Sequence, residues 1–380
     1  MKERSGQCQS LTRRARIAIF VSFSGTGGVE RMIMNLTAGL IDRGVNVDVI
    51  PVREKSAHLG SLHSAARMVD LESSHTLSSL PGLVRYLRAE KPDALLAAKD
   101  RANVIAVLAR RIAGVSTRVV LRMGTTVSGA LAGRRPLKEH LWYFRMKMLY
   151  PLADAVVAVS SGVAKDLEKN AGLSSALVTV IPNPVITTDL VALSEEPIEH
   201  PWYRDAGPPV ILGVGRLTRQ KDFPTLLRAF AAVRKSRSCR LIILGEGRDR
   251  SNLESLAKRL GIQEHVSLPG FARNPYPYMK RAAAFILSSL WEGSPNVLTE
   301  ALALGTPVVS TDCPSGPREV LDHGRFGPLV PMGNPDTLAH AILTVLNAPP
   351  EKSLLKSAVA AYTVQESSRK YLDLLLGKGD

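Results

Sequence analysis

Cysteine is scarce in this 380-residue chain, and its apolar runs are short. The three cysteines, Cys8, Cys239 and Cys313, form no CxxC pair, and one of them would stay unpaired in any disulfide pattern. Both facts disfavour a disulfide framework and a zinc site. No apolar run approaches the ~20 residues of a membrane span. The run IAIFVSF is short and leads into a glycine loop, so it predicts a strand rather than a signal sequence. These features favour a protein of the reducing cytoplasm.

Metal-ligand patterns are also lacking. No Asp-x-Asp pair stands out as a metal site, and the eight histidines lie outside any motif. We therefore expect metal-independent chemistry without a cofactor, and histidines that are structural or lie on the surface.

Basic residues outnumber acidic ones, mainly in the first half of the chain. Residues 1–190 contain 26 Lys and Arg against 15 Asp and Glu, a net charge of +11, whereas residues 191–380 contain 23 against 19, a net charge of +4. A basic half favours an anionic partner such as phosphate, acidic lipid or nucleic acid. It is equally compatible with a basic surface that has no particular partner.

The length and the alternation of patterns predict two α/β domains. A single core rarely exceeds about 250–300 residues. Short β-rich runs alternate with amphipathic stretches, which predicts parallel sheets covered on both faces, in two Rossmann-like doubly wound domains. The expected strands begin at Arg16, Val45, Ala94, Thr117, Ala155, Pro209, Arg240, His265, Ala284 and Thr306.

Prolines between residues 182 and 209 interrupt the pattern, as a linker would. We expect an N-terminal domain over 1–190, a C-terminal domain over 205–350, and a helical segment over 351–380 that could cross back to the first domain.

Two loops that follow predicted first strands have the composition of anion sites. Gly27 and Gly28 lie where a strand turns into a helix, so the backbone can approach a ligand and the helix N-terminus can face an anion. Arg216 and Lys221 follow the first strand of the second domain, at the sheet edge where ligands of such folds bind. A guanidinium and an ammonium suit a diphosphate. Taken alone, the glycine loop could equally be an ordinary turn, and Arg216 and Lys221 would more often be two solvated cations.

A pair of glutamates with the spacing E-x7-E follows a later strand. Glu292 is expected on a loop and Glu300 inside the helix that begins between them. A carboxylate can accept two sugar hydroxyls, and the helix N-terminus can face phosphate. A glutamate on a helix is more often solvated, but VLTEALALGTPVV would bury Glu300 unless it lines a cleft.

The ordered set GGVER, VGRLTRQKDF, LIILGEG, LPGF, NPYPYM, LSSLWEGSPNVLTEALALGTPVVSTDCPSGPREVL and GPLVP resembles glycosyltransferase family 4, whose members are retaining enzymes of the GT-B fold. The resemblance covers nearly the whole chain and is densest from Pro209 to Pro331. It implies a hexosyltransferase with two Rossmann-like domains facing across a cleft. The TDCPSGPREV segment is similar to members that transfer hexoses or N-acetylhexosamines to polysaccharide, oligosaccharide or lipid-linked acceptors, which implies a UDP-sugar donor.

The resemblance also implies roles for individual residues. Arg216 and Lys221 would bind the donor diphosphate, and Glu300 the ribose. Glu292 would hold the sugar, so that Arg216, Lys221 and Glu292 form the catalytic group. The remaining donor-binding residues would be Gly27, Gly28, Phe271, Asn274, Gly293, Ser294, Asn296 and Val297.

One family feature is absent. Many members have a histidine after the fourth strand, near the donor sugar, but the corresponding stretch here is VVLRMGTTVSG. Arg122 or Thr125 could fill that space.

The segment 133–150 is basic and amphipathic. Leu137, Leu141, Phe144 and Met148 recur at helical spacing, and five cations stand against Glu139 alone. Trp142, Tyr143 and Tyr150 are aromatic rings suited to a membrane interface. The segment predicts reversible attachment to the anionic inner face of the cell membrane. The same stripe could instead be the core face of an ordinary helix.

Two other functions remain open. A nucleotide-sugar epimerase can share the fold, but no acid and base around a sugar are evident. A non-enzymatic basic adaptor for membrane or nucleic acid would leave Arg216, Lys221, Glu292 and Glu300 unexplained, and we expect no nucleic-acid partner.

Overall fold

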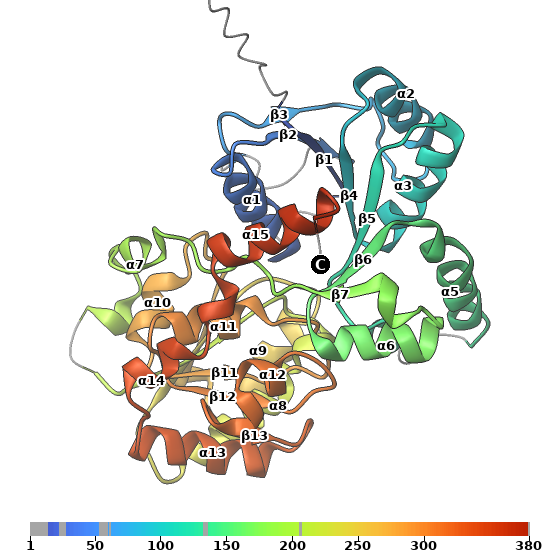
Figure 1. Ribbon diagram of the computed structural model, residues 1–380. Helices are drawn as coiled ribbons and strands as arrows, with labels where there is room; N and C mark the ends of the chain where they lie inside the picture. Colours follow the sequence, from blue (N-terminus) through green and yellow to red (C-terminus); the bar gives the residue numbers. More distant parts are fainter. Residues whose placement is uncertain are drawn as a thin grey trace, which may run out of the picture.

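The computed structural model describes residues 14–22, 28–52, 60, 62–131, 136–204 and 207–378, with the backbone alone for 136–139. It contains two parallel sheets, each covered by helices on both faces (Figure 1). We call the unit around the first sheet the N-terminal lobe and the unit around the second the C-terminal lobe. The predicted fold class, two facing doubly wound α/β units, is confirmed. In the part of the chain that the structure describes, no helix is long and apolar enough to cross a membrane.

The N-terminal sheet has the order β3-β2-β1-β4-β5-β6-β7, and all its pairs are parallel. Its strands are β1 (Arg16–Val21), β2 (Asn46–Pro51), β3 (Arg67–Met68), β4 (Ala94–Ala98), β5 (Arg118–Met123), β6 (Ala155–Ala158) and β7 (Val178–Val180).

Side chains of this sheet alternate between two cores, as the period of a strand requires. Ile17 and Ile19 pack on one face with α1 (Gly28–Ile41) and α15 (Val364–Leu375), whereas Ala18 and Phe20 pack on the other. The second face is covered by α2 (Leu80–Glu90), α3 (Asp100–Ala113), α4 (Val127–Leu131), α5 (Pro136–Leu149) and α6 (Ser161–Ala171).

The C-terminal sheet has the order β10-β9-β8-β11-β12-β13. Its strands are β8 (Val210–Val214), β9 (Arg240–Leu244), β10 (Val266–Gly270), β11 (Ala284–Leu287), β12 (Val308–Thr311) and β13 (Leu329–Val330). Its helices are α8 (Phe223–Arg234), α9 (Arg250–Arg259), α10 (Tyr276–Arg281), α11 (Asn296–Ala303), α12 (Pro317–Val320), α13 (Pro335–Asn347) and α14 (Lys352–Ser357).

The chain passes between the lobes twice, and the two passages are hydrogen-bonded to each other. The first follows β7 and includes α7 (Leu190–Leu193), and the second joins α14 to α15. The N–H groups of Val185 and Ile186 both donate to the carbonyl of Tyr362, and the N–H of Val364 donates back to Ile186. Helix α15 then packs on α1, where a Cβ on Gly39 would lie 2.7 Å from Ser368 Oγ.

All ten predicted strands form, within two residues of the expected starts. The structure adds β3, β7 and β13, which have two or three residues each and which the sequence patterns miss. Because β3, β7 and β13 are so short and few of their residues are buried, no apolar run marks them. The predicted helix near the C-terminus is interrupted between α14 and α15, where the chain changes lobe.

Candidate active site

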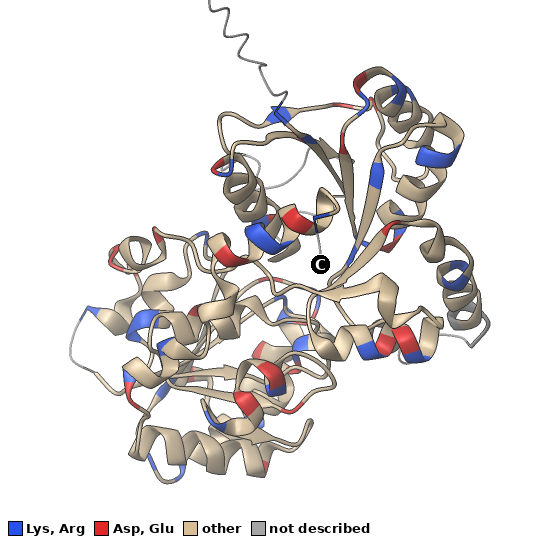
Figure 2. Cartoon of the chain, in the orientation of Figure 1, with Lys and Arg blue, Asp and Glu red and all other residues tan. Residues whose placement is uncertain are grey.

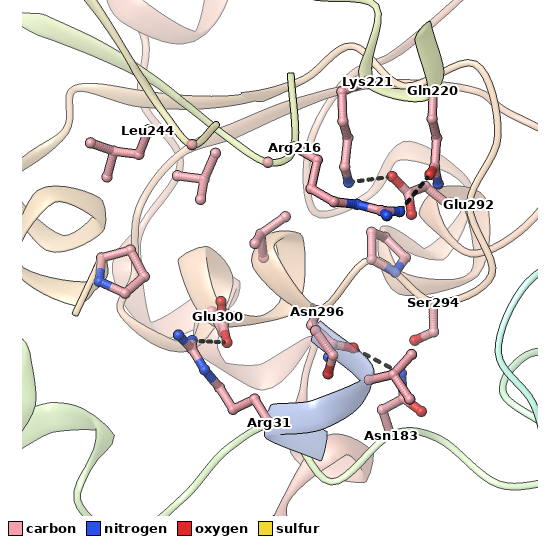
Figure 3. Close-up of a pocket in the computed structure, with 18 of the residues that line it drawn as sticks. Arg31, Asn183, Arg216, Gln220, Lys221, Leu244, Glu292, Ser294, Asn296 and Glu300 are labelled. Atoms are coloured by element: carbon pink, nitrogen blue, oxygen red, sulfur yellow. Dashed lines mark hydrogen bonds and ion pairs between the residues drawn. The ribbon is translucent and has the colours of Figure 1, made fainter. Parts of the chain in front are cut away.

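A cavity of about 250 Å³ lies between the lobes (Figure 3). The ends of β1, β5, β8, β9 and β11 lead into segments that line it, so the carboxyl edges of both sheets face the same space. This is where open α/β sheets bind their ligands. The backbone is tightly folded here: Gly245 has a φ of 141°, and a Cβ on it would lie 2.0 Å from the carbonyl oxygen of Gly215. Only glycine fits at that position.

An ion pair occupies one wall of the cavity. Lys221 Nζ lies 2.6 Å from Glu292 Oε1, and Ser289 Oγ donates to the same oxygen at 2.7 Å. Both charged side chains are mostly buried, and Arg216 beside them contacts Gln220 only at 3.4 Å. Figure 3 shows Arg216 reaching toward this pair. The wall therefore contains two cations: Lys221, which is paired with a carboxylate, and Arg216, which has no carboxylate partner among the described residues.

A second charged group crosses from one lobe to the other. Arg31, in the first turn of α1, places Nη1 3.2 Å from Glu300 Oε1 and 3.3 Å from the hydroxyl of Tyr276. Burial lowers the pKa of Arg31, but the contacts with Glu300 and Tyr276 outweigh it, so the pKa is raised. Glu300 is 2% exposed, and its Oε2 atom is buried without a hydrogen-bond partner.

A hydrogen-bonded chain joins the lobes at the floor of the cavity. Arg122, at the end of β5, donates from Nη2 to Asn183 Oδ1 at 2.7 Å. Asn183 donates to Asn296 Oδ1 at 2.8 Å, and Asn296 donates to the carbonyl of Gly28 at 3.3 Å. This chain links the start of α1, the linker and the N-terminus of α11.

Further contacts hold the two lobes together beside the cavity. Ser160 Oγ donates to the carbonyl of Gly293, and Glu319 accepts from the backbone N–H and the hydroxyl of Ser161. A Cβ on Gly293 would lie 2.2 Å from the carbonyl oxygen of Gly124, so the lobes meet here backbone to backbone.

Most of the site residues expected from the sequence line this one cavity: Gly28, Arg216, Lys221, Phe271, Glu292, Ser294, Asn296, Val297 and Glu300. Helix α11 begins between the two glutamates, as predicted. Gly293 and Asn274 do not line the cavity, and the Asn274 amide donates instead to Leu193 and Glu196 of the linker. Gly27 lies outside the described residues.

Of the two residues that could fill the place of the absent histidine, Arg122 lines the cavity. A Cβ on Gly124 would lie 2.8 Å from its Nη1, so the guanidinium occupies the space that a side chain at 124 would use. Arg122 is 2% exposed, and its Nε has no hydrogen-bond partner. Thr125 instead forms a backbone bridge with Gly293.

Sequence reasoning missed Arg31, Asn183 and Gln220, which also line the cavity. Arg31 follows directly on the glycine loop in GGVER, and Asn183 lies in IPNPV. Their positions beside recognised segments were the available signal. Their contacts with the other lobe were not visible in a linear sequence.

Helix α5 lies on the outer side of the N-terminal lobe (Figure 1). Apolar side chains occupy two of its faces, one exposed and one packed on the core. Leu141, Phe144 and Met148 are 59%, 60% and 55% exposed, so the predicted stripe is not a core face at these positions. The side chain of Leu137 lies outside the described residues.

Of the aromatic rings expected at a membrane interface, Trp142 and Tyr143 lie on the core side of α5, and Tyr150 lies in the turn that follows it. The expectation is wrong for Tyr150. Tyr150 is fully buried and its hydroxyl contacts Asp100 and Asn103, while Trp142 and Tyr143 pack against the core. Their spacing places them inward, beside the fully buried Met146. Arg145 pairs with Asp100 at 3.0 Å and lies over the Trp142 ring.

Two facing doubly wound sheets, with cations and carboxylates gathered between them, form the GT-B architecture. Residues 26–189 match the family model "Glycosyltransferase Family 4", and residues 208–348 match "Glycosyl transferases group 1". The chain belongs to glycosyltransferase family 4.

Relatives along the full length support this membership. The chain is 30% identical to the N-acetylgalactosamine-N,N'-diacetylbacillosaminyl-diphospho-undecaprenol 4-alpha-N-acetylgalactosaminyltransferase of Campylobacter jejuni, over 95% of this chain and 100% of that protein. It is 28% identical to the lipopolysaccharide core biosynthesis glycosyltransferase LpsE of Rhizobium meliloti, over 94% and 98%. The fold is shared with the structure of Anabaena Alr3699/HepE in complex with UDP-glucose, which superposes with a TM-score of 0.77 at 20% identity and covers 95% and 99% of the two chains.

Proposed function

We propose that this enzyme transfers a hexose or N-acetylhexosamine from a UDP-sugar, with retention of configuration, to a polysaccharide, oligosaccharide or lipid-linked acceptor. The observation that carries the proposal is the gathering of Arg216, the Lys221–Glu292 pair and Glu300 around one cavity between the lobes. The relatives support this chemistry: one transfers to a diphospho-undecaprenol acceptor, and one structural neighbour binds UDP-glucose.

In the proposed arrangement, 205–350 binds the donor and 1–190 faces the acceptor, with 351–380 returning to the first domain. Arg216 and Lys221 bind the diphosphate, helped by the backbone N–H groups at the N-terminus of α11. Glu292 orients the sugar, and Glu300 accepts the ribose hydroxyls. Phe271, which is 43% exposed at the cavity, offers an apolar face to the base. Arg122 lies near the donor sugar, where many family members have a histidine.

Retention in such a site needs no protein nucleophile, because the acceptor oxygen can arrive on the face from which the diphosphate leaves. The enzyme then lowers the barrier mainly by stabilising charge on the leaving group. A preorganised donor aimed at such charge contributes about 2.7–4 kcal/mol in measured cases. Lobes that meet around the substrates also exclude water and fix the orientation of both reactants.

Two measurements test this function. Incubation with a panel of UDP-sugars, followed by mass analysis and assay of slow donor hydrolysis, should identify one preferred donor. UDP should raise the unfolding temperature, because a ligand at 100 times its Kd adds about 2.7 kcal/mol of stability. Failure of every UDP-sugar to be hydrolysed or transferred, together with no thermal shift, would contradict the proposal.

We further propose that the outward stripe of α5, defined by Leu141, Phe144 and Met148, rests on the anionic cytoplasmic face of the cell membrane. Large apolar side chains that are more than half exposed and share one helix face favour an interface. Figure 2 shows basic positions along α5, and the sequence places five cations between residues 133 and 150 against Glu139. A bilayer of acidic lipid complements both properties, and it would bring the cleft toward a lipid-linked acceptor.

A further inference from the structure

The carboxylate of Glu300 has one oxygen engaged and one that is free of any partner. Oε1 lies 3.2 Å from Arg31 Nη1 and 3.4 Å from the hydroxyl of Tyr276. Oε2 is buried and accepts no hydrogen bond, although Glu300 lines the cavity. A buried carboxylate oxygen without a donor is costly, which indicates that a ligand hydroxyl is its partner.

The group that holds Oε1 comes from the opposite lobe. Arg31 belongs to α1 of the N-terminal lobe, whereas Glu300 and Tyr276 belong to α11 and α10 of the C-terminal lobe. Among the ion pairs of the described residues, this one alone joins a helix of the first sheet to a helix of the second. The Arg31 guanidinium also lies over the Tyr276 ring, with its Cζ 5.5 Å from the centroid, so its position is fixed from two sides.

We propose that Arg31 is a positioning residue for the donor nucleotide: by holding Oε1 of Glu300 across the cleft, it presents Oε2 to the donor ribose. The inference rests on the proposed UDP-sugar function and deepens it. Ribose recognition by the C-terminal lobe then depends on an arginine of the N-terminal lobe. Donor affinity is thereby coupled to the approach of the two lobes.

The coupling has a specific thermodynamic consequence. Replacing Arg31 should weaken only the part of nucleotide binding that passes through the ribose hydroxyls. UDP and 2′,3′-dideoxy-UDP share the base and the diphosphate, so a variant that acts on the ribose contact changes the ratio of their affinities. A variant that merely loosens the fold lowers the affinity for both nucleotides by the same factor.

Titration calorimetry of the full chain with both nucleotides tests this inference. The wild-type enzyme should bind UDP at least about tenfold more tightly than 2′,3′-dideoxy-UDP. Arg31→Gln should lose most of that preference and leave dideoxy-UDP binding nearly unchanged. Tyr276→Phe should lose a smaller part of it. Arg111→Gln, which removes the same charge from an exposed position of the same lobe, should bind like the wild type.

The contrary outcomes distinguish the positioning role of Arg31 from the donor class of the enzyme. An equal loss for both nucleotides in Arg31→Gln, an unchanged preference, or tighter UDP binding would overturn the positioning role while leaving the donor class intact. Absence of UDP binding by the wild-type enzyme would overturn the proposed function and this inference together. Far-ultraviolet circular dichroism and the unfolding temperature of each variant establish that it is folded.

Discussion

Lys221 Nζ and Glu292 Oε1 lie 2.6 Å apart on the cavity wall, so the cation assigned to the diphosphate is already paired with a carboxylate. Removing either partner leaves the other buried and uncompensated. Such a loss typically costs about 3–5 kcal/mol. The pair is therefore part of the architecture of the cavity as well as of its chemistry.

We predict that Lys221→Ala abolishes transfer and also lowers the free energy of unfolding by about 3 kcal/mol, because Glu292 loses its counter-ion. The double variant Lys221→Met/Glu292→Gln removes both charges and should recover most of that stability without recovering activity. Urea unfolding and a transfer assay measure the two effects separately. Wild-type turnover in Lys221→Ala would contradict the assignment of this residue to the diphosphate.

Glu300→Ala should abolish transfer at little cost to folding. In this variant Arg31 loses its counter-ion, but it still contacts the hydroxyl and the ring of Tyr276, and its side chain is 25% exposed to water. The measurements are turnover and the urea midpoint, and the site assignment fails if the variant turns over at the wild-type rate.

Gly293→Ala should reduce kcat/KM by at least about tenfold, because a misplacement of about 1 Å can cost a hundredfold in rate. The new methyl group would meet the Gly124 carbonyl oxygen at 2.2 Å and push the lobes apart. Gly60→Ala is the matched control, since nothing lies within 4 Å of a Cβ there. Equal activity of the two variants would show that contact at Gly293 is dispensable.

The stereochemical outcome provides an independent test. An α-linked donor should give an α-linked product, which one-dimensional proton NMR of the anomeric region reports directly. A β-linked product would require a general base on the opposite face of the sugar, and the proposed mechanism would then be rejected.

Replacing Leu141, Phe144 and Met148 together by serine should reduce co-sedimentation with acidic vesicles several-fold at low salt. Because the three side chains are more than half exposed, stability should change little. Binding of the wild type should fall at high salt, as screening of lipid charge requires. Val191→Ser, which removes an exposed apolar side chain from α7, serves as the control. If the wild-type protein stays in the supernatant with acidic vesicles at low salt, the membrane proposal should be dropped.

The main features of the fold could be predicted because they depend on local pattern. Buried parallel strands are continuous apolar runs, so the central strands were recognised with small errors. The strands β3, β7 and β13 were missed because two or three residues are too few to form an apolar run.

The site could be predicted only as far as each segment carried its own motif. Arg216, Lys221, Glu292 and Glu300 stand in recognisable stretches, and the structure brings them to one cavity. The pairing of Arg31 with Glu300 and the placement of Arg122 against Gly124 depend on how the lobes meet. The inward position of Trp142, and of Tyr150 directly after α5, was missed because α5 has two apolar faces, and spacing alone does not show which one meets the core.

The two passages between the lobes make the enzyme hard to divide. A protease that cuts the exposed stretch around Glu195–Glu196 severs the first passage only. The second passage still ends in α15, whose Tyr371 and Leu375 are fully buried against the first sheet. The nicked chain should therefore elute as one particle and separate only in denaturant, with its C-terminal fragment anchored in the core of its N-terminal one.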